Sequence, residues 1–200
     1  MNMVLRRPMD AAAGGAGGRA LPTRAIQIAN AVIFQAAWFA AVLGAAHDAP
    51  MAGTLCVLAA LMWHLSVSAQ PLREARLVVL ACAVGLVVET IGVHLGWIAY
   101  ASGQPLAQWP PYWLVALWGL LAMALNVTLR WLRQRLWLAA LLGAVAGPLS
   151  FICGVRLGAG HFIDAAPALV ELAIAWAIAM PLLVRLSVRH DGVREEANCP

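Results

Sequence analysis

The glutamate at position 89 is the side chain in this sequence best placed to do chemistry. It lies about twelve residues into an apolar stretch, Leu77 to Tyr100, that has the length of a membrane span. A charge near the middle of a bilayer costs roughly 2.5 to 3.5 kcal/mol even on insertion scales, so such residues are usually functional. A neutral or paired glutamate there can act as catalytic acid or base, carry a proton, or bind a polar head group. The alternative is a structural hydrogen bond, which Ser, Thr or Asn would make at lower cost.

Three glycines share a helical stripe with Glu89. They are Gly85, Gly92 and Gly96, so the spacings along the stripe are four, three and four residues. Small residues in this pattern let a second helix approach closely. The sequence therefore predicts a partner helix beside the carboxyl group.

Two further ionisable residues are predicted at similar depth on neighbouring helices. Arg156 ends the fifth apolar stretch, and Glu171 lies about one turn into the sixth, which runs in the opposite direction. The two side chains can form a pair, which would make both tolerable in the membrane. Alternatively, Arg156 binds the carboxylate or phosphate of a ligand, or extends to the membrane surface. The residues alone leave these possibilities open.

Three tryptophans, Trp38, Trp118 and Trp176, are predicted near mid-depth, although indoles prefer the membrane interface. They either line a cavity for an acyl or isoprenoid chain or fill space opposite glycines.

Pro148 predicts a kink in the fifth stretch. The glycine-rich segment from Gly154 to Gly160 predicts irregular backbone, which survives at membrane depth only beside protein or a wet cavity and is therefore a candidate pocket rim.

Six apolar stretches must position these residues. The composition, 63% hydrophobic and 11% charged, is that of a membrane protein and not of a soluble domain. We expect an all-α polytopic fold with a flexible cytoplasmic tail at 1–24, a six-helix transmembrane domain at 25–186 and a cytoplasmic tail at 187–200. The predicted spans are Ala25 to Ala46, Met51 to Ala69, Leu77 to Tyr100, Tyr112 to Leu129, Leu136 to Val155 and Pro167 to Leu186.

The basic residues indicate how the chain crosses the membrane. Twelve of the thirteen, all arginines, flank alternate connections, and only Arg156 lies elsewhere. Because short cytoplasmic loops carry the excess of arginine and lysine, both termini are predicted inside. These arginines have no groove-reading motif around them, so we expect contacts with membrane lipids and no nucleic-acid partner.

The other polar residues indicate structural roles and not a metal or cofactor site. No two acidic, histidine or cysteine residues near Glu89 have ligand spacing on one helix face, and no nucleotide-binding motif occurs, so we expect no metal and no cofactor. A second polar set comprises Gln27, Asn30, His64 and Asn126. Hydrogen bonds between helices explain it best.

Several short patterns resemble those of a bacterial inner-membrane family described as a domain of unknown function, and the resemblance covers nearly all of Ala25 to Leu186. The patterns are Asn30-x4-Gln35-x2-Trp38, Glu89-x2-Gly92-x3-Gly96-Trp97, Pro111-x-Trp113-x4-Trp118, Gly147-Pro148-Leu149-Ser150 and Gly154-x-Arg156-x-Gly158-Ala159. The resemblance implies a multi-pass protein of the bacterial inner (cytoplasmic) membrane. It also implies that the gene for this protein lies near genes for cyclopropane-fatty-acid synthase and flavin-dependent oxidoreductases. Such a neighbourhood would imply a role in lipid metabolism or envelope stress. It assigns no catalytic residue.

The residues together predict a pocket open toward the outer leaflet that holds a lipid-like amphipathic molecule. Glu89, Arg156 and Glu171 would meet its polar end, and Trp38, Trp118 and Trp176 its tail. In an enzyme, Glu89 would be the acid or base and Arg156 the anion stabiliser. In a proton-coupled transporter or flippase, Glu89 would carry the proton, although the two halves show no clear similarity. A third possibility is a membrane anchor for a soluble lipid-modifying enzyme, bound through the arginine-rich loops.

Overall fold

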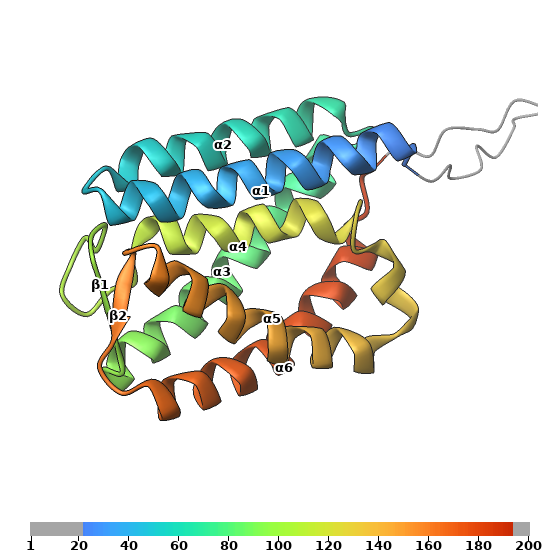
Figure 1. Cartoon of the computed structure of the whole chain (residues 1–200). Helices are drawn as coiled ribbons and strands as arrows, with labels where there is room; N and C mark the ends of the chain where they lie inside the picture. Colours follow the sequence, from blue (N-terminus) through green and yellow to red (C-terminus); the bar gives the residue numbers. More distant parts are fainter. Residues whose placement is uncertain (1–21, 194–200) are drawn as a thin grey trace, which may run out of the picture.

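The computed structural model describes residues 22–193. Residues 1–21 of the predicted N-terminal tail and 194–200 of the C-terminal tail therefore lie outside the described residues. As predicted, the described chain is built on six α-helices, joined by one 3-10 helix and two short strands (Figure 1). The elements are α1 (Arg24–Ala46), α2 (Pro50–Val67), α3 (Pro71–Leu95), β1 (Ile98–Tyr100), α4 (Tyr112–Leu125), η1 (Arg130–Gln134), α5 (Leu136–Arg156), β2 (Gly160–Phe162) and α6 (Ala165–Arg189).

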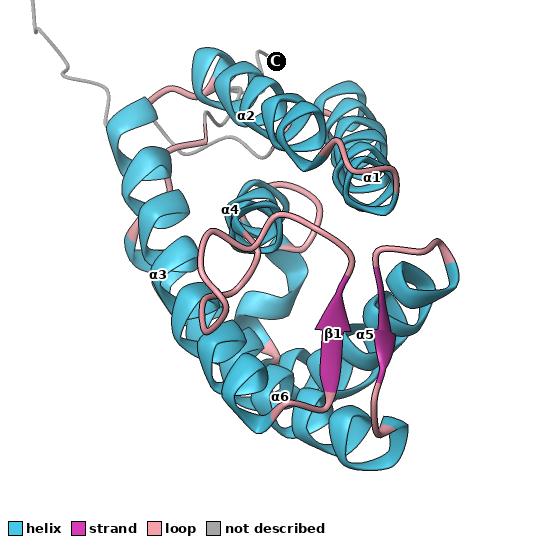
Figure 2. Cartoon of the chain, turned by 90° about the vertical axis from the view of Figure 1, so that its left-hand side faces the viewer, coloured by secondary structure: helices cyan, strands magenta, loops and turns pink. Residues whose placement is uncertain are grey.

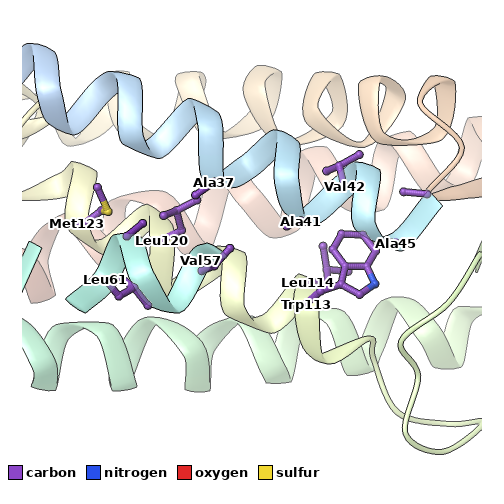
Figure 3. Close-up of a cluster of buried hydrophobic side chains, with 12 residues drawn as sticks. Ala37, Ala41, Val42, Ala45, Val57, Leu61, Trp113, Leu114, Leu120 and Met123 are labelled. Atoms are coloured by element: carbon purple, nitrogen blue, oxygen red, sulfur yellow. The ribbon is translucent and has the colours of Figure 1, made fainter. Parts of the chain in front are cut away.

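Two helical hairpins enclose a central helix. Helices α1 and α2 pack as one hairpin, α5 and α6 as the other, and α4 lies between them with α3 along its side (Figure 1). Small side chains allow these close contacts, as expected where helices associate by packing and not by exclusion of water. Figure 3 shows the cluster where Ala37 and Ala41 of α1, Val57 of α2, and Leu120 and Met123 of α4 meet.

Five helices, all except α4, are long and apolar enough to cross a membrane. By helix length and hydropathy, the chain is a multi-pass membrane protein. Helix α4 has 14 residues and ends at Leu125, so the predicted extent to Leu129 was wrong. It is about 21 Å long, shorter than a hydrocarbon core of about 30 Å. Ten of its residues are buried among the other helices, so lipid contact does not set its length.

The helix ends form two distinct ends of the molecule. One, the arginine-rich end, holds the start of α1, the start of α3, η1 and the end of α6. Of the nine arginines in residues 22–193, all except Arg156 lie in these elements or, for Arg135, directly after η1. Hydrogen bonds between the start of α3 and the segment after α6, such as Gln70 N to Gly192 O at 2.9 Å, hold this end together.

The opposite end, the sheet end, carries a two-stranded antiparallel sheet that was not predicted. Its register pairs Ala99 with His161, and Figure 2 shows the two strands side by side. The prediction of irregular backbone from Gly154 to Gly160 was therefore wrong in part. Helix α5 continues through Arg156 with Pro148 inside it, and a turn with Gly158 at φ 93° leads into β2. Three-residue strands carry too short an alternation to be recognised in sequence.

The orientation of the two ends is open to a direct test. In a cysteine-free variant, His161→Cys at the sheet end and Arg135→Cys at the arginine-rich end both introduce exposed thiols. We expect a membrane-impermeant thiol reagent to label position 161 in intact cells and position 135 only after lysis, because the arginine-rich end should face the cytoplasm. Labelling of position 135 in intact cells would show that the arginine-rich end faces the outside, opposite to the predicted orientation.

Candidate functional site

Glu89 is buried between α3 and α4, with 2% of its surface exposed. Its Oε1 accepts a hydrogen bond from Trp118 Nε1 at 3.0 Å, and its Oε2 accepts one from the Tyr100 hydroxyl at 3.4 Å. One turn away, a Cβ on Gly85 would collide with the Trp118 side chain. The predicted partner helix beside Glu89 is therefore confirmed as α4, and Gly85 is the glycine that admits it.

The other two glycines of the Glu89 stripe, Gly92 and Gly96, have different structural roles from Gly85. Gly96 ends α3 in the left-handed conformation at φ 70°, which favours glycine. A Cβ on Gly92 would have Glu171 Oε2 as its nearest neighbour, at 4.0 Å. Gly92 thus lies beside the acid of α6 and does not contact α4.

Tyr100 connects Glu89 to the sheet end. It lies in β1, outside the spanning helices, and its ring packs edge-on against Trp113 with centroids 6.4 Å apart. Burial, and then the neighbouring Glu89 carboxylate, raise the pKa of Tyr100 well above its usual range. The hydroxyl therefore stays protonated and acts as a donor to Glu89. Trp113 is buried, and its Nε1 donates to Ser102 O at 3.0 Å.

Two of the predicted tail-binding tryptophans pack against each other. The rings of Trp118 and Trp176 stack at 4.6 Å with an interplanar angle of 28°. Trp176 rests on the glycine face of α5, where a Cβ on Gly147 would collide with its ring. This pair fills space opposite glycines, which was one of the two predicted roles. Trp38 lies apart, beside a small apolar cavity of about 40 Å³ between α1, α4 and α5.

Glu171 faces a groove between α3 and α6, here called the lateral groove. The groove has a volume of about 820 Å³, and Glu171 is the one ionisable residue among the seventeen that line it. The acid is half-buried and forms no hydrogen bond or ion pair with any described residue. It is close enough to Glu89 for the two carboxyl groups to interact electrostatically.

Arg156 does not join these acids. It is exposed at the end of α5 and, within residues 22–193, forms no ion pair with Glu171. The prediction of a pair rested on depth alone. Helix α6 turns Trp176 and Met180 toward Gly143 of α5, whereas Glu171 points to α3. Five residues separate Glu171 from Trp176, which is about 140° around the helix.

Sequence reasoning missed a second buried acid, Glu74, because the predicted span began at Leu77. Glu74 lies in the first turn of α3 and is fully buried. Its carboxylate accepts hydrogen bonds from His64 Nε2 at 2.9 Å, Asn126 Nδ2 at 2.7 Å and Gly192 N at 2.6 Å. The available signal was the spacing of Glu74 on the same stripe as Leu77, Ala81, Gly85 and Glu89.

Arginines of η1 complete this network. Arg133 donates to Asn126 Oδ1 at 2.6 Å and pairs with Asp191 at 2.8 Å, and Arg130 pairs with Asp191 at 2.7 Å. We call His64, Glu74, Asn126, Arg133 and Asp191 the Glu74 network. It ties α2, α3, α4, η1 and the segment after α6 together at the arginine-rich end. Buried charges in such a network are tolerable because each is paired.

The second polar set is interhelical for three of its four members. His64 and Asn126 belong to the Glu74 network, and Asn30 of α1 donates to Met123 O of α4 at 3.2 Å. Gln27 instead bonds to Pro22 O, just before its own helix, so the prediction was wrong for that residue.

An apolar layer separates the Glu74 network from Glu89. The two acids are fifteen positions apart on α3, or about 22 Å along the helix. Leu77, Ala81 and Leu125 fill the interval and are buried. Within residues 22–193, no three His, Cys, Asp or Glu side chains are grouped to hold a metal ion. The acids at the two ends therefore belong to separate sites.

Comparisons with known proteins agree with the resemblance at family level. No curated protein and no solved structure matches the chain. A family model described as "Protein of unknown function (DUF2878)" matches residues 27–182, which is most of the chain and all six helices in whole or in part. The chain therefore belongs to the DUF2878 family.

Proposed function

We propose that this protein binds a membrane lipid in the lateral groove, with the polar end of the lipid at Glu171. The observation that carries the proposal is an acid without a partner among the described residues, set in an otherwise apolar groove of about 820 Å³. That volume falls within the range of about 300 to 1,000 Å³ typical of small-molecule sites. A carboxyl group in such surroundings, with no partner among residues 22–193, needs a polar partner from elsewhere, and we propose that a lipid supplies it.

The groove is placed to exchange molecules with the hydrocarbon of a bilayer. It runs between two spanning helices, and residues along it such as Val87, Ile174 and Ile178 expose much of their surface. Glu171 lies about 9 Å from the start of α6, so a polar group just below the bilayer surface would reach it. With the arginine-rich end in the cytoplasm, this is the outer leaflet of the bacterial inner membrane.

The setting of Glu89 favours binding over catalysis or transport. Both of its oxygens already accept hydrogen bonds, and α4 covers it. A general acid or base needs a direct approach to its substrate, which Glu171 has and Glu89 lacks. Because Leu77, Ala81 and Leu125 fill the space toward the Glu74 network, a proton path through the bundle has little support.

A role as an anchor for a lipid-modifying enzyme is compatible with lipid binding, because both would bring a lipid to a partner. The exposed arginines Arg73, Arg76 and Arg135 offer a cytoplasmic contact surface. The gene neighbourhood implied by the resemblance would supply such a partner, and this remains a prediction.

Lipid analysis of the purified protein tests the proposal. We expect one lipid class to co-purify in excess over its share of the membrane, and Ile174→Trp, which fills the groove, to remove that excess. Leu149→Trp on α5 is the matched control, because Leu149 is 53% exposed and Ile174 57% but only Ile174 lines the groove. A lipid profile identical to that of the whole membrane would refute the proposal.

A further inference from the structure

The shape and charge of the lateral groove indicate what kind of lipid it takes. We infer that the groove holds a single hydrocarbon chain longer than one leaflet, ending in a hydroxyl or amine that bonds to Glu171. A long-chain polyprenol has this chemistry, and a phosphate or carboxylate lipid does not. The inference rests on the proposed function and adds the class of ligand.

The dimensions of the groove select one chain. Its lining runs from Leu80 to Trp97 on the α3 side and from Pro167 to Leu186 on α6. At 1.5 Å per residue these stretches are each about 25 to 28 Å long, whereas one leaflet contributes about 15 Å of hydrocarbon. The occupant therefore passes the middle of the membrane.

Volume and length together favour one extended chain. About 820 Å³ spread over about 25 Å makes the groove long and narrow, and an extended hydrocarbon chain lies along such a shape. A helix, about 10 to 12 Å wide with its side chains, would instead have to cover the open face of the groove.

The charges at the sheet end of the groove select the head group. Glu171 faces the groove, and Glu89 lies behind it with both oxygens already hydrogen-bonded. Arg156, the arginine at this end among residues 22–193, does not line the groove. An anionic head would thus meet the Glu171 carboxyl group, with Glu89 buried nearby, and no cation from the described chain. A hydroxyl or amine can donate to Glu171, which has acceptor capacity to spare.

Binding of three probes to the purified protein in detergent, followed by native mass spectrometry, tests this inference. The probes are a long-chain polyprenol, its phosphate monoester and a short-chain polyprenol. We expect the long alcohol to bind roughly tenfold or more tightly than the phosphate, because like charges placed together in a desolvated site repel. The short alcohol should bind more weakly than the long one, because it buries less apolar surface.

Variants of Glu171 separate charge from shape. Glu171→Gln keeps an acceptor without the charge, so alcohol binding should persist while discrimination against the phosphate falls roughly tenfold. Glu171→Leu should weaken alcohol binding. Ile174→Trp should block every probe, and Leu149→Trp none.

The possible failures are distinguishable. If no probe binds the wild-type protein although one lipid class co-purifies with it, only the ligand class is wrong. If no lipid class co-purifies in excess, or Ile174→Trp does not remove the bound lipid, the groove is not a lipid site and the proposed function falls too. If Ile174→Trp blocks the probes but the phosphate binds as tightly as the alcohol, only the head-group assignment is wrong. Equal binding of the short and long alcohols would overturn the length argument. A protein dimer that Ile174→Trp abolishes would make a second copy the occupant.

Discussion

Glu74→Ala is expected to lower the free energy of unfolding by roughly 3 to 5 kcal/mol, the range for removing one partner from a buried charge network. The alanine would leave His64 Nε2 and Gly192 N without their acceptor, and would remove one of the two acceptors of Asn126 Nδ2. Because the network joins five segments, its loss should open the arginine-rich end. Thermal unfolding in detergent, followed by tryptophan fluorescence, measures the change.

Two comparisons isolate the cause of this loss. Glu171→Ala removes the same type of side chain from a half-buried position where it forms no hydrogen bond or ion pair with the described residues. The stability of this variant should therefore stay near that of the wild type. Gly192→Ala should destabilise the same end by another route, because a Cβ there would collide with Gln70 O and lie 3.1 Å from Glu74 Cγ. If Glu74→Ala were no less stable than Glu171→Ala, the network would not hold this end together.

Glu89→Leu is expected to destabilise the protein by roughly 2 to 6 kcal/mol. Leucine leaves two donors, Trp118 Nε1 and the Tyr100 hydroxyl, without their acceptor in a buried site. Each unsatisfied donor costs about 1 to 3 kcal/mol. Glu89→Gln should stay close to wild type, since its amide oxygen can accept from Trp118 and its amide nitrogen can donate to the tyrosine oxygen. Thermal unfolding of the two variants gives the comparison.

Lipid content of the Glu89→Gln protein separates structure from function. If Glu89 only supports the wall behind Glu171, the amide variant should retain the co-purifying lipid as well as its stability. A stable Glu89→Gln protein that has lost the lipid would instead make the acid itself a functional group. Equal stability of Glu89→Leu and the wild type would show that the two hydrogen bonds contribute nothing measurable.

Hydropathy and the positions of the arginines were sufficient to predict a helical multi-pass protein and the bounds of α1, α2, α5 and α6 to within three residues, whereas α3 begins six residues and ends five residues earlier than the predicted span. These signals are local, because an apolar helix satisfies its own backbone hydrogen bonds whatever surrounds it. The glycine spacing around Glu89 was also sufficient to predict a helix beside that acid, since a stripe without side chains permits close approach from one direction. Where the signal was not local, prediction failed. Helix α4 ends at Leu125, and the next residue, Asn126, bonds to Glu74, 52 residues earlier in the chain.

Only the tertiary structure decided which side chains meet. Depth along two helices does not determine the direction in which each side chain points, so Arg156 and Glu171 looked like a pair although α6 turns its acid toward α3. The Glu74 network draws on five segments, and no local pattern links them. The lateral groove depends on how α3 and α6 lie relative to each other, which is set by the helices packed against them. Sequence determined the elements and their depth, and packing determined the site, because rotation and crossing of helices arise from contacts between residues far apart in the chain.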